Sequence, residues 1–379
     1  MSEERLDRLR RRIRNLDAAM LGLMAERMEL AREVGKEKID AGIPLRDFEV
    51  EKRVLERAAA SAEALGLAPE LARGVMRQLV EEACRVQEID HFSTYSGEAE
   101  TILVVGGAGK MGHWLVRFFE TQGHRVLVCD PAAGPAAGPV PGPAPGPAAT
   151  ATVATLAEGL ASASMVFVAV PLDRVAAAVD EIAAAGFKGV LCDVASVKEH
   201  LRPALEAARE RGVAVTSIHP MFGAGARTLS DKVICLCDCG VPAATERVAA
   251  LFRETAVTLV PLSLERHDEI ASYVLGLSHF LNLLFARVLA TSGLSFAELT
   301  AVGSTTFHSQ FATTESVVRE NPLLYYEIQR SNRFSERVYR ELERAAADWI
   351  GWVEQGEPEH FAAAMRKLTG WLDGRSGEG

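Results

Sequence analysis

The chain has 379 residues, of which 48% are hydrophobic, and a formal net charge of -10 at pH 7. This length and composition predict two or three domains with a large core, and the acidic balance argues against a nucleic-acid partner. No apolar run reaches the roughly 18 residues of a membrane span, and the charged N-terminus lacks a signal-peptide core. We therefore expect a cytoplasmic protein that has no membrane partner.

The six cysteines lie on predicted strands and helices, without the spacing of a disulfide framework, as is usual in a reducing compartment. Three of them, Cys235, Cys237 and Cys239, alternate along one strand-like run. Because no second ligand cluster accompanies them, we predict no metal site.

Three helices are predicted in the first 90 residues: a long one from about residue 4, a second around 47–65 and a third around 69–89. A helix about 50 Å long cannot bury its apolar face against two shorter partners, so we expect an intertwined dimer. The apolar residues recur with the period of one helical face; they are Leu6, Leu9, Ile13, Leu16, Met20, Leu23, Leu30 and Val34.

Arg27 stands where this apolar row should continue between Leu23 and Leu30. A guanidinium is costly to bury unless an anion meets it. Lys38 follows eleven residues later, within about 20° of the same helical face. The alternative is an Arg27 that extends to solvent and a solvated Lys38 at the helix end, but the pair favours a pocket for an anion.

From residue 101 the pattern changes to strands that alternate with helices. Strands are predicted over 101–105, 125–129, 165–170, 189–193, 213–218 and 232–237. Such alternation predicts an α/β domain of the Rossmann type, a parallel sheet with helices on both faces. Between 131 and 149 the chain is nearly all Pro, Ala and Gly, which predicts an extended loop.

Beyond Pro261 the strand pattern stops, and amphipathic stretches over 264–292, 304–320, 323–355 and 359–372 predict an all-helical C-terminal domain. We place the domains at residues 1–92, 98–262 and 263–379.

A glycine-rich turn follows the first predicted strand: Gly107, Ala108, Gly109, Lys110, Met111 and Gly112. Glycines allow the backbone to approach a pyrophosphate, which then lies at a helix N-terminus. Asp130 ends the second strand, where a carboxylate binds ribose hydroxyls and repels a 2′-phosphate. The motif therefore predicts an NAD site. Glycines that merely tighten a turn would leave Asp130 unexplained.

Two further strand ends carry polar residues where an open sheet places its ligand. The first runs from Asp193 through Ser196 to Lys198, and the second contains His219 followed by Pro-Met-Phe-Gly. A lone histidine is more often structural, but one at a strand end beside a nicotinamide can accept a proton while hydride leaves.

With these motifs the sequence resembles the prephenate dehydrogenase family, whose members carry the same Gly-rich turn, the Ser-Val-Lys element and the His-Pro-Met-Phe-Gly element. The first 90 residues resemble the all-helical chorismate mutases, and the whole chain resembles the fused, bifunctional enzymes. The resemblance implies a three-helix mutase domain in an intertwined dimer, a Rossmann domain and a helical dimerisation domain.

For the mutase, the resemblance implies that Arg10 and Arg27 bind carboxylates, that Lys38 and Gln87 donate to the ether oxygen, and that Asp47 and Glu51 hold the hydroxyl. Arg10 lies about 100° from Arg27 around the helix, so it should serve the partner subunit's pocket. The rearrangement is unimolecular, so fixed cations that clamp a dicarboxylate are enough.

For the dehydrogenase, the resemblance implies that Ser196 and His219 hold and deprotonate the substrate's 4-hydroxyl, while NAD takes the hydride and CO2 leaves. Other pocket positions match Lys198, His267, Asp268, Ser278 and His279.

The sequence departs from the family at several positions. Val50 and Ser316 stand where arginine is usual, His308 replaces another frequent arginine, and Ala83 replaces a serine. Arg319 could substitute for the arginine missing at 316, although it points about 60° away around the helix.

Three functional hypotheses follow. The first is a bifunctional enzyme that makes 4-hydroxyphenylpyruvate from chorismate. The second is the same chemistry on 4-amino-4-deoxychorismate. The third is a dehydrogenase whose N-terminal helices only dimerise or regulate.

Overall fold

A computed structural model describes residues 3–40, 48–91, 97–130, 151–226, 229 and 232–374. The chain divides into two compact units. The first comprises Met1–Ser196 with Leu201–Leu264, and the second comprises Val197–His200 with Glu265–Gly379. The predicted Pro-rich loop at 131–149 and Asp47 lie outside the described residues.

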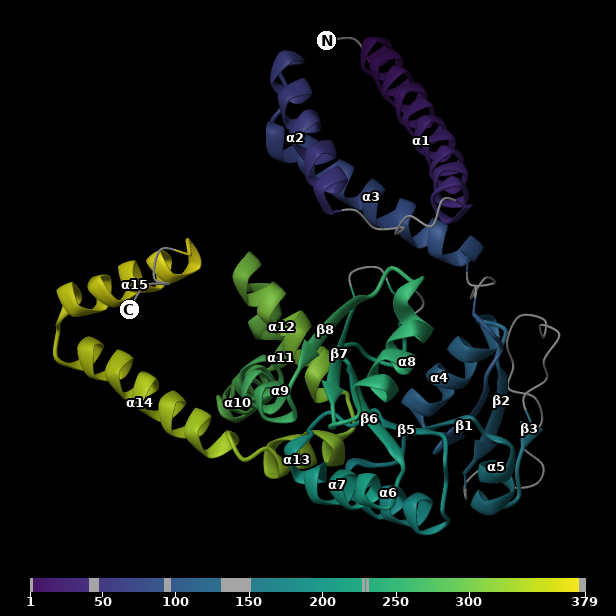
Figure 1. Ribbon diagram of the computed structural model, residues 1–379. Helices are drawn as coiled ribbons and strands as arrows, with labels where there is room; N and C mark the ends of the chain where they lie inside the picture. The colour runs from purple at the N-terminus through teal and green to yellow at the C-terminus, as the bar shows by residue number, and fades with distance from the viewer. Residues whose placement is uncertain are drawn as a thin grey trace. The chain divides into compact units, whose positions relative to one another are not determined.

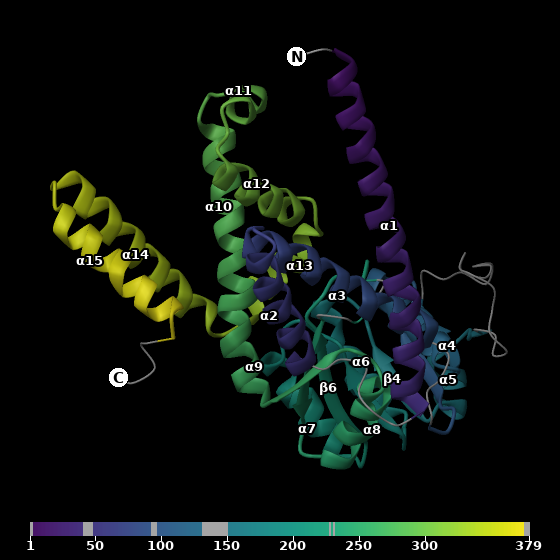
Figure 2. The same cartoon turned by 90° about the horizontal axis from the view of Figure 1, so that it is seen from above.

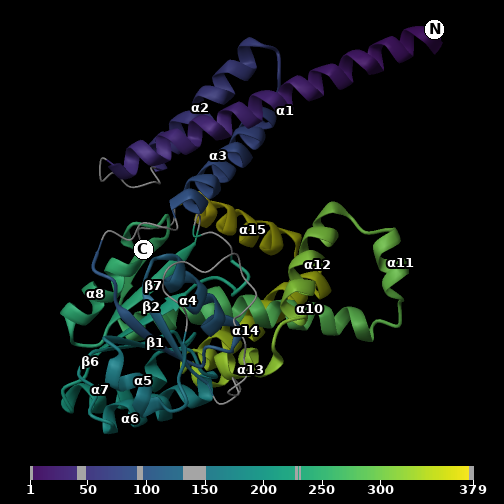
Figure 3. The same ribbon diagram turned by 90° about the vertical axis from the view of Figure 1, so that its right-hand side faces the viewer.

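The first three helices confirm the predicted helical N-terminal region: α1 (Glu3–Asp40), α2 (Phe48–Ala64) and α3 (Pro69–His91) (Figure 3). α1 has 38 residues and is about 57 Å long at 1.5 Å per residue. Every member of its apolar row, from Leu6 to Val34, is 38–66% exposed in the single chain. Helices α2 and α3 therefore do not cover the face of α1 that the sequence predicts to be buried.

The sheet has eight strands in the order β3-β2-β1-β4-β5-β6-β7-β8. Their bounds are β1 (Thr101–Val105), β2 (Arg125–Cys129), β3 (Ala151–Thr152), β4 (Met165–Val168), β5 (Val190–Asp193), β6 (Ala214–Pro220), β7 (Val233–Asp238) and β8 (Thr258–Leu262). Neighbouring strands run parallel except β6 and β7, which pair antiparallel.

The expectation of a parallel sheet was thus wrong at β7. Residues 221–226, 229 and 232, which are the described residues between β6 and β7, form no helix, and a chain reversal without a crossover helix makes the next strand antiparallel. The two edge strands were also missed. β3 has only two residues, and β8 contains Pro261, which edge strands tolerate because they have a side without ladder hydrogen bonds.

Helices cover both faces of the sheet, as predicted (Figure 1). α4 (Lys110–Thr121) and α8 (Pro242–Arg253) cover one face, and α5 (Leu156–Ser162), α6 (Val175–Ala184) and α7 (Arg202–Glu210) cover the other. Phe118 of α4 stacks on Phe252 of α8 with centroids 5.0 Å apart, and Phe119 meets Phe167 of β4 at 4.7 Å. These rings fill the core between helices and sheet.

His124, directly before β2, gives this domain a predictable response to acid. The ring is fully buried, and its Nδ1 accepts a hydrogen bond from the Glu100 N–H at 3.1 Å. Burial lowers the pKa of His124 below its ordinary value of 6.5, against the opposing effect of the Glu100 charge. The unfolded chain therefore binds the proton more tightly, and stability falls as the pH drops below about 6.5.

We expect wild-type protein to lose up to about 1.4 kcal/mol of unfolding free energy per pH unit from this residue, and His124→Gln to show a flatter dependence. Urea unfolding at pH 7.5 and 5.5 measures the difference. His360→Gln is the matched control, because His360 is 66% exposed and bonds Glu357 on the surface. Equal slopes for wild type and His124→Gln would contradict this assignment.

The second unit is helical, as predicted: α9 (Leu264–Ala271), a π-helical segment η3 (Ser272–Leu277), α10 (Ser278–Thr291), α11 (Phe296–Ala301), α12 (Thr305–Val318), α13 (Pro322–Ser331), α14 (Ser335–Glu354) and α15 (Pro358–Leu372). Helices α14 and α15 lie side by side (Figure 2), with Trp349 and Phe361 rings 4.6 Å apart. The single amphipathic stretch predicted over 323–355 is wrong, because the helix stops at Ser331 and restarts at Ser335.

Within the described residues, the run Leu264–Thr291 is long and apolar enough to cross a membrane by length and composition. This corrects the expectation that no apolar run reaches that length. One such helix is weak evidence for a membrane span, since core helices of soluble proteins can be equally long and apolar.

Candidate functional site

The first candidate site lies where α1 meets α3. The Arg27 guanidinium donates to the Leu79 carbonyl at 2.7 Å and is half-buried. Burial lowers the pKa of Arg27 below its ordinary value, and Cys84 opposes the shift. Arg27 is therefore not a solvated surface cation: its charge lies against the neighbouring helix, at the break in the apolar row.

Gln87 reaches the same interface from α3. Its side chain is 7% exposed, and Nε2 donates to the Ala31 carbonyl at 2.7 Å. Lys38 is half-buried near the end of α1. The structure thus brings Arg27 and Gln87 together on one helix pair.

The remaining mutase positions are less well defined. Arg10 is exposed and pairs with Asp7 at 3.6 Å, away from Arg27 along α1. Glu51 belongs to α2, but its side chain lies outside the described residues, as does Asp47. Val50 is exposed and Ala83 is buried.

The second candidate site begins at the glycine-rich turn between β1 and α4. A Cβ on Gly112 would lie 2.1 Å from the Gly106 carbonyl oxygen, and one on Gly107 would lie 2.6 Å from the Val128 side chain. Only glycine fits these two positions. The residue with positive φ is Gly106, at 88°, one position before the predicted motif, and sequence reasoning missed it.

Asp130 lies beside this turn. Its Oδ2 accepts a hydrogen bond from the Ala108 N–H at 2.9 Å, which holds the carboxylate at the end of β2. Helix α4 begins after Gly109 with no side-chain cap, so its first N–H groups can bind an anion. A close-packed turn, an uncapped helix and a carboxylate at the next strand end fit a dinucleotide.

Ser196 follows the end of β5, and His219 is the last residue but one of β6. The two strands are parallel neighbours, with Asp193 opposite Ser217. His219 is 5% exposed, and Ser196 is half-buried. The carboxyl ends of β1, β4, β5 and β6 share one edge of the sheet. Three strand spacings of about 4.8 Å place β6 roughly 14 Å from β1. His219 and the glycine-rich turn therefore lie on the same edge of the sheet.

Trp114 of α4 connects this helix to the loop after His219, and the sequence analysis did not identify it. Its Nε1 donates to the Ala226 carbonyl at 2.9 Å, and its ring meets Phe222 edge-on at 5.0 Å. The ring is buried. Trp114 therefore fixes residues 221–226 against α4, the helix that begins at the glycine-rich turn.

In the second unit, the fully buried Asp268 holds the segment that contains Lys198. Its carboxylate accepts hydrogen bonds from the backbone N–H groups of Lys198 and Glu199, each at 2.8 Å. Oδ1 also lies 2.8 Å from Nδ1 of His267. This contact favours a histidine with the proton on Nδ1, which leaves Nε2 as an acceptor.

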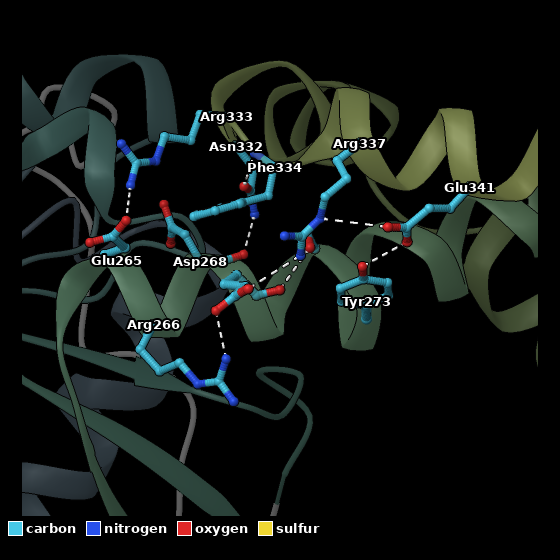
Figure 4. A network of polar contacts seen from close by, with 11 residues as sticks. Glu265, Arg266, Asp268, Tyr273, Asn332, Arg333, Phe334, Arg337 and Glu341 are labelled. Atoms are coloured by element: carbon cyan, nitrogen blue, oxygen red, sulfur yellow. Dashed lines mark hydrogen bonds and ion pairs between the residues drawn. The ribbon is translucent and has the colours of Figure 1, made fainter. Parts of the chain in front are cut away.

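Figure 4 shows how α14 and the helix break support this segment. The Asn332 amide donates to the Asp268 carbonyl at 2.8 Å, and Arg333 bonds Glu265. Arg337 bonds Glu269 at 3.3 Å. The interruption at Asn332 that the sequence did not predict therefore has a function in packing.

Ser278 and His279 open α10, directly after the π-helical segment. The Gly276 carbonyl in that segment accepts a hydrogen bond from Gln329 at 2.9 Å. His279 stacks on Tyr325 with ring centroids 4.1 Å apart, and burial lowers the pKa of His279. This shift favours the neutral ring. Ser278 is exposed.

The departures on α12, Ser316 and His308, lie at the surface, as does Arg319 directly after this helix. Arg319 has a side chain that is 76% exposed and bonds Glu315 at 2.7 Å, so its contact with substrate stays a prediction. Ser316 donates to the Thr313 carbonyl at 2.7 Å, and His308 is exposed.

Three family models match the chain. Chorismate mutase type II matches residues 9–88, the nucleotide-binding domain of prephenate dehydrogenase matches 148–260, and the prephenate dehydrogenase dimerization domain matches 263–367. The nucleotide-binding match begins after the glycine-rich turn and Asp130.

Among curated relatives, the T-protein of Enterobacter agglomerans is 26% identical over 367 residues, which is 97% of this chain and 93% of that protein. The T-protein of Haemophilus influenzae is 24% identical, with the same coverage of each chain. The 4-amino-4-deoxyprephenate dehydrogenase of Streptomyces pristinaespiralis is 30% identical over 279 residues, covering 71% of this chain and 90% of that protein.

Among solved structures, the prephenate dehydrogenase of Aquifex aeolicus matches with a TM-score of 0.54 and 14% identity, covering 72% of this chain and 99% of that one. At that identity the likeness shows the fold alone. Taken with the three family models, the relatives show that this chain belongs to the prephenate dehydrogenase family and carries a chorismate mutase type II domain before it.

Proposed function

We propose that this chain is a bifunctional enzyme, an isomerase and an NAD-dependent oxidoreductase, that rearranges chorismate to prephenate and converts prephenate to 4-hydroxyphenylpyruvate, the route to tyrosine. The observation that carries the proposal is one chain with two kinds of site: a half-buried Arg27 and a buried Gln87 where α1 meets α3, and a glycine-rich turn on the same sheet edge as His219.

The mutase step needs no acid, base or nucleophile, because it is a unimolecular rearrangement. The pocket accelerates it by holding the dicarboxylate in its compact conformer and by stabilising negative charge on the ether oxygen as the bond breaks. Arg27 binds a carboxylate, and Lys38 and Gln87 donate to the ether oxygen. Asp47 and Glu51 hold the hydroxyl.

In the dehydrogenase step, Ser196 holds the 4-hydroxyl of prephenate and His219 accepts its proton as hydride leaves C4. CO2 leaves C1, and the electron pair it leaves behind makes the ring aromatic, while the 4-oxygen takes its proton back from His219 to give the hydroxyl of the product. Aromatisation makes the step essentially irreversible. NAD supplies the hydride acceptor when bound. Lys198, His267, Ser278, His279 and Arg319 are proposed substrate contacts.

We further propose a cytoplasmic homodimer. The exposed apolar row on α1 supports a partner helix along its length, and a matching dimerization domain supports a second interface. In such a dimer Arg10 reaches the partner subunit's pocket, which explains why it lies away from Arg27 within its own chain.

Purified full-length protein supplied with chorismate and NAD tests the function. We expect NADH, CO2 and 4-hydroxyphenylpyruvate in equal amounts, and prephenate alone when NAD is omitted. If the protein turns over neither chorismate nor prephenate, the proposal is excluded.

A second candidate is the same pair of reactions on the 4-amino-4-deoxy substrates. It is favoured by Val50, Ser316 and His308, which stand where arginine is usual or frequent in the family, and by the relative that is 30% identical and carries that activity in its name. Comparing kcat/KM for the hydroxy and amino substrates decides between the two. A preference for the hydroxy substrate excludes the second candidate.

Asp130 supports NAD over NADP, since its carboxylate would repel a 2′-phosphate. We expect Asp130→Ala to lower kcat/KM for NAD about tenfold, the effect of losing a hydrogen bond to a charged group, and to raise the NADP/NAD ratio. Steady-state rates with each cofactor measure both. Asp180→Ala, an exposed carboxylate on α6, is the control and should change neither. An unchanged cofactor ratio in Asp130→Ala would contradict the role.

A further inference from the structure

The backbone of α1 between Ala31 and Gly35 forms the surface on which the Gln87 side chain lies. Nε2 of Gln87 donates to the Ala31 carbonyl at 2.7 Å. One turn later, a Cβ on Gly35 would lie 2.7 Å from Cγ and 3.2 Å from Cβ of Gln87. Real side-chain carbons do not approach so closely. A methyl group at 35 and Gln87 in its present position therefore exclude each other.

The Ala31 carbonyl also decides which end of the amide is presented. A glutamine amide has two N–H donors on nitrogen and only acceptors on oxygen. With one N–H on Ala31, the nitrogen is held against α1, and its second N–H can still donate to a ligand. A flipped amide would place its oxygen against the Ala31 oxygen, which is repulsive.

We propose that Gly35, together with the Ala31 carbonyl, positions Gln87 as the hydrogen-bond donor of the mutase site. This inference rests on the proposed function, in which Gln87 donates to the breaking ether oxygen. Gly35 touches no substrate in this account and acts only through Gln87. Gly35 is buried, so exposure to solvent does not explain why this position has no side chain.

Gly22 provides a matched control on the same helix. A Cβ there meets no atom within 4 Å, and both residues lie in the interior of α1. Glycine to alanine ordinarily stabilises a helix interior, so Gly22→Ala and Gly35→Ala gain the same helix propensity. Gly22 is exposed and Gly35 is buried, so the two substitutions differ in what the new methyl group meets.

The test compares mutase turnover of the full-length wild type, Gly22→Ala and Gly35→Ala. We expect Gly22→Ala to match wild type. Gly35→Ala should lose about 100-fold in kcat, the effect of misplacing a catalytic group by about 1 Å. KM for chorismate should change little, because the ether-oxygen contact strengthens in the transition state. Prephenate oxidation, measured in the same preparations, should be unchanged and reports that the variant is folded.

A double-mutant cycle with Gln87→Ala separates positioning from general damage to the helix pair. Alanine at 87 removes the Cγ that the new methyl group would meet at 2.7 Å and keeps only the Cβ at 3.2 Å. In that background Gly35→Ala should therefore cost much less than in the wild type, since the amide it displaces is absent. An equal loss in both backgrounds would overturn the inference, as would wild-type turnover in Gly35→Ala itself. A wild-type enzyme that does not turn over chorismate would instead overturn the proposed function.

Discussion

Replacing His219 by asparagine should lower NADH formation from prephenate by about 1000-fold, within the range that general base catalysis contributes. His219 is the histidine at the end of β6, 5% exposed, on the sheet edge that carries the glycine-rich turn. Asparagine keeps a polar group of similar size but cannot accept the hydroxyl proton. Initial rates with saturating NAD and prephenate measure the loss.

Chorismate turnover in the same variant should stay at the wild-type rate, because the mutase residues lie on α1, α2 and α3. NAD affinity should also be unchanged, since Asp130 and the glycine-rich turn are intact. Matched binding and far-ultraviolet circular dichroism then report a folded protein. If both activities fall in a well-folded His219→Asn protein, the two reactions do not use separate sites.

The sheet edge that carries this chemistry is predictable because strand ends, glycines and carboxylates leave local signals. Gly107, Gly112 and Asp130 lie as the motif requires. The positive φ at Gly106 escaped prediction because nothing local distinguishes it from Gly107. The direction of β7 escaped because alternation predicts parallel strands only where a helix connects them, and the described residues between β6 and β7 form none.

Residues that act through long-range contacts leave no such signal. Trp114 is 112 positions from the Ala226 carbonyl that it bonds, and Asp268 is 70 positions from Lys198. Asn332 ends a helix whose amphipathic period continues past it, because its amide bonds the Asp268 carbonyl instead. Arg27 is different: it interrupts a regular apolar row, and this local irregularity identified it before any contact was known.

Replacing Arg27 by alanine should reduce chorismate turnover by about 100- to 1000-fold, which is the usual cost of removing one preorganised charge-stabilising group. KM for chorismate should rise as well, because a carboxylate loses its cation in the bound substrate. Prephenate oxidation should be unaffected. Arg32→Ala is the control: Arg32 lies five residues later on α1 and bonds Glu29, so its loss should leave both activities intact.

The same variant separates an enzyme from a packing module, because the two hypotheses predict opposite effects. A helix that only dimerises is weakened by a half-buried cation, whose desolvation already lowers the pKa of Arg27, and alanine there would strengthen the dimer. A catalytic pocket loses activity while the dimer persists. Sedimentation of Arg27→Ala at several concentrations, beside its mutase rate, therefore decides the question. If Arg27→Ala forms a tighter dimer and the wild-type protein has no mutase activity, the N-terminal helices serve only for dimerisation.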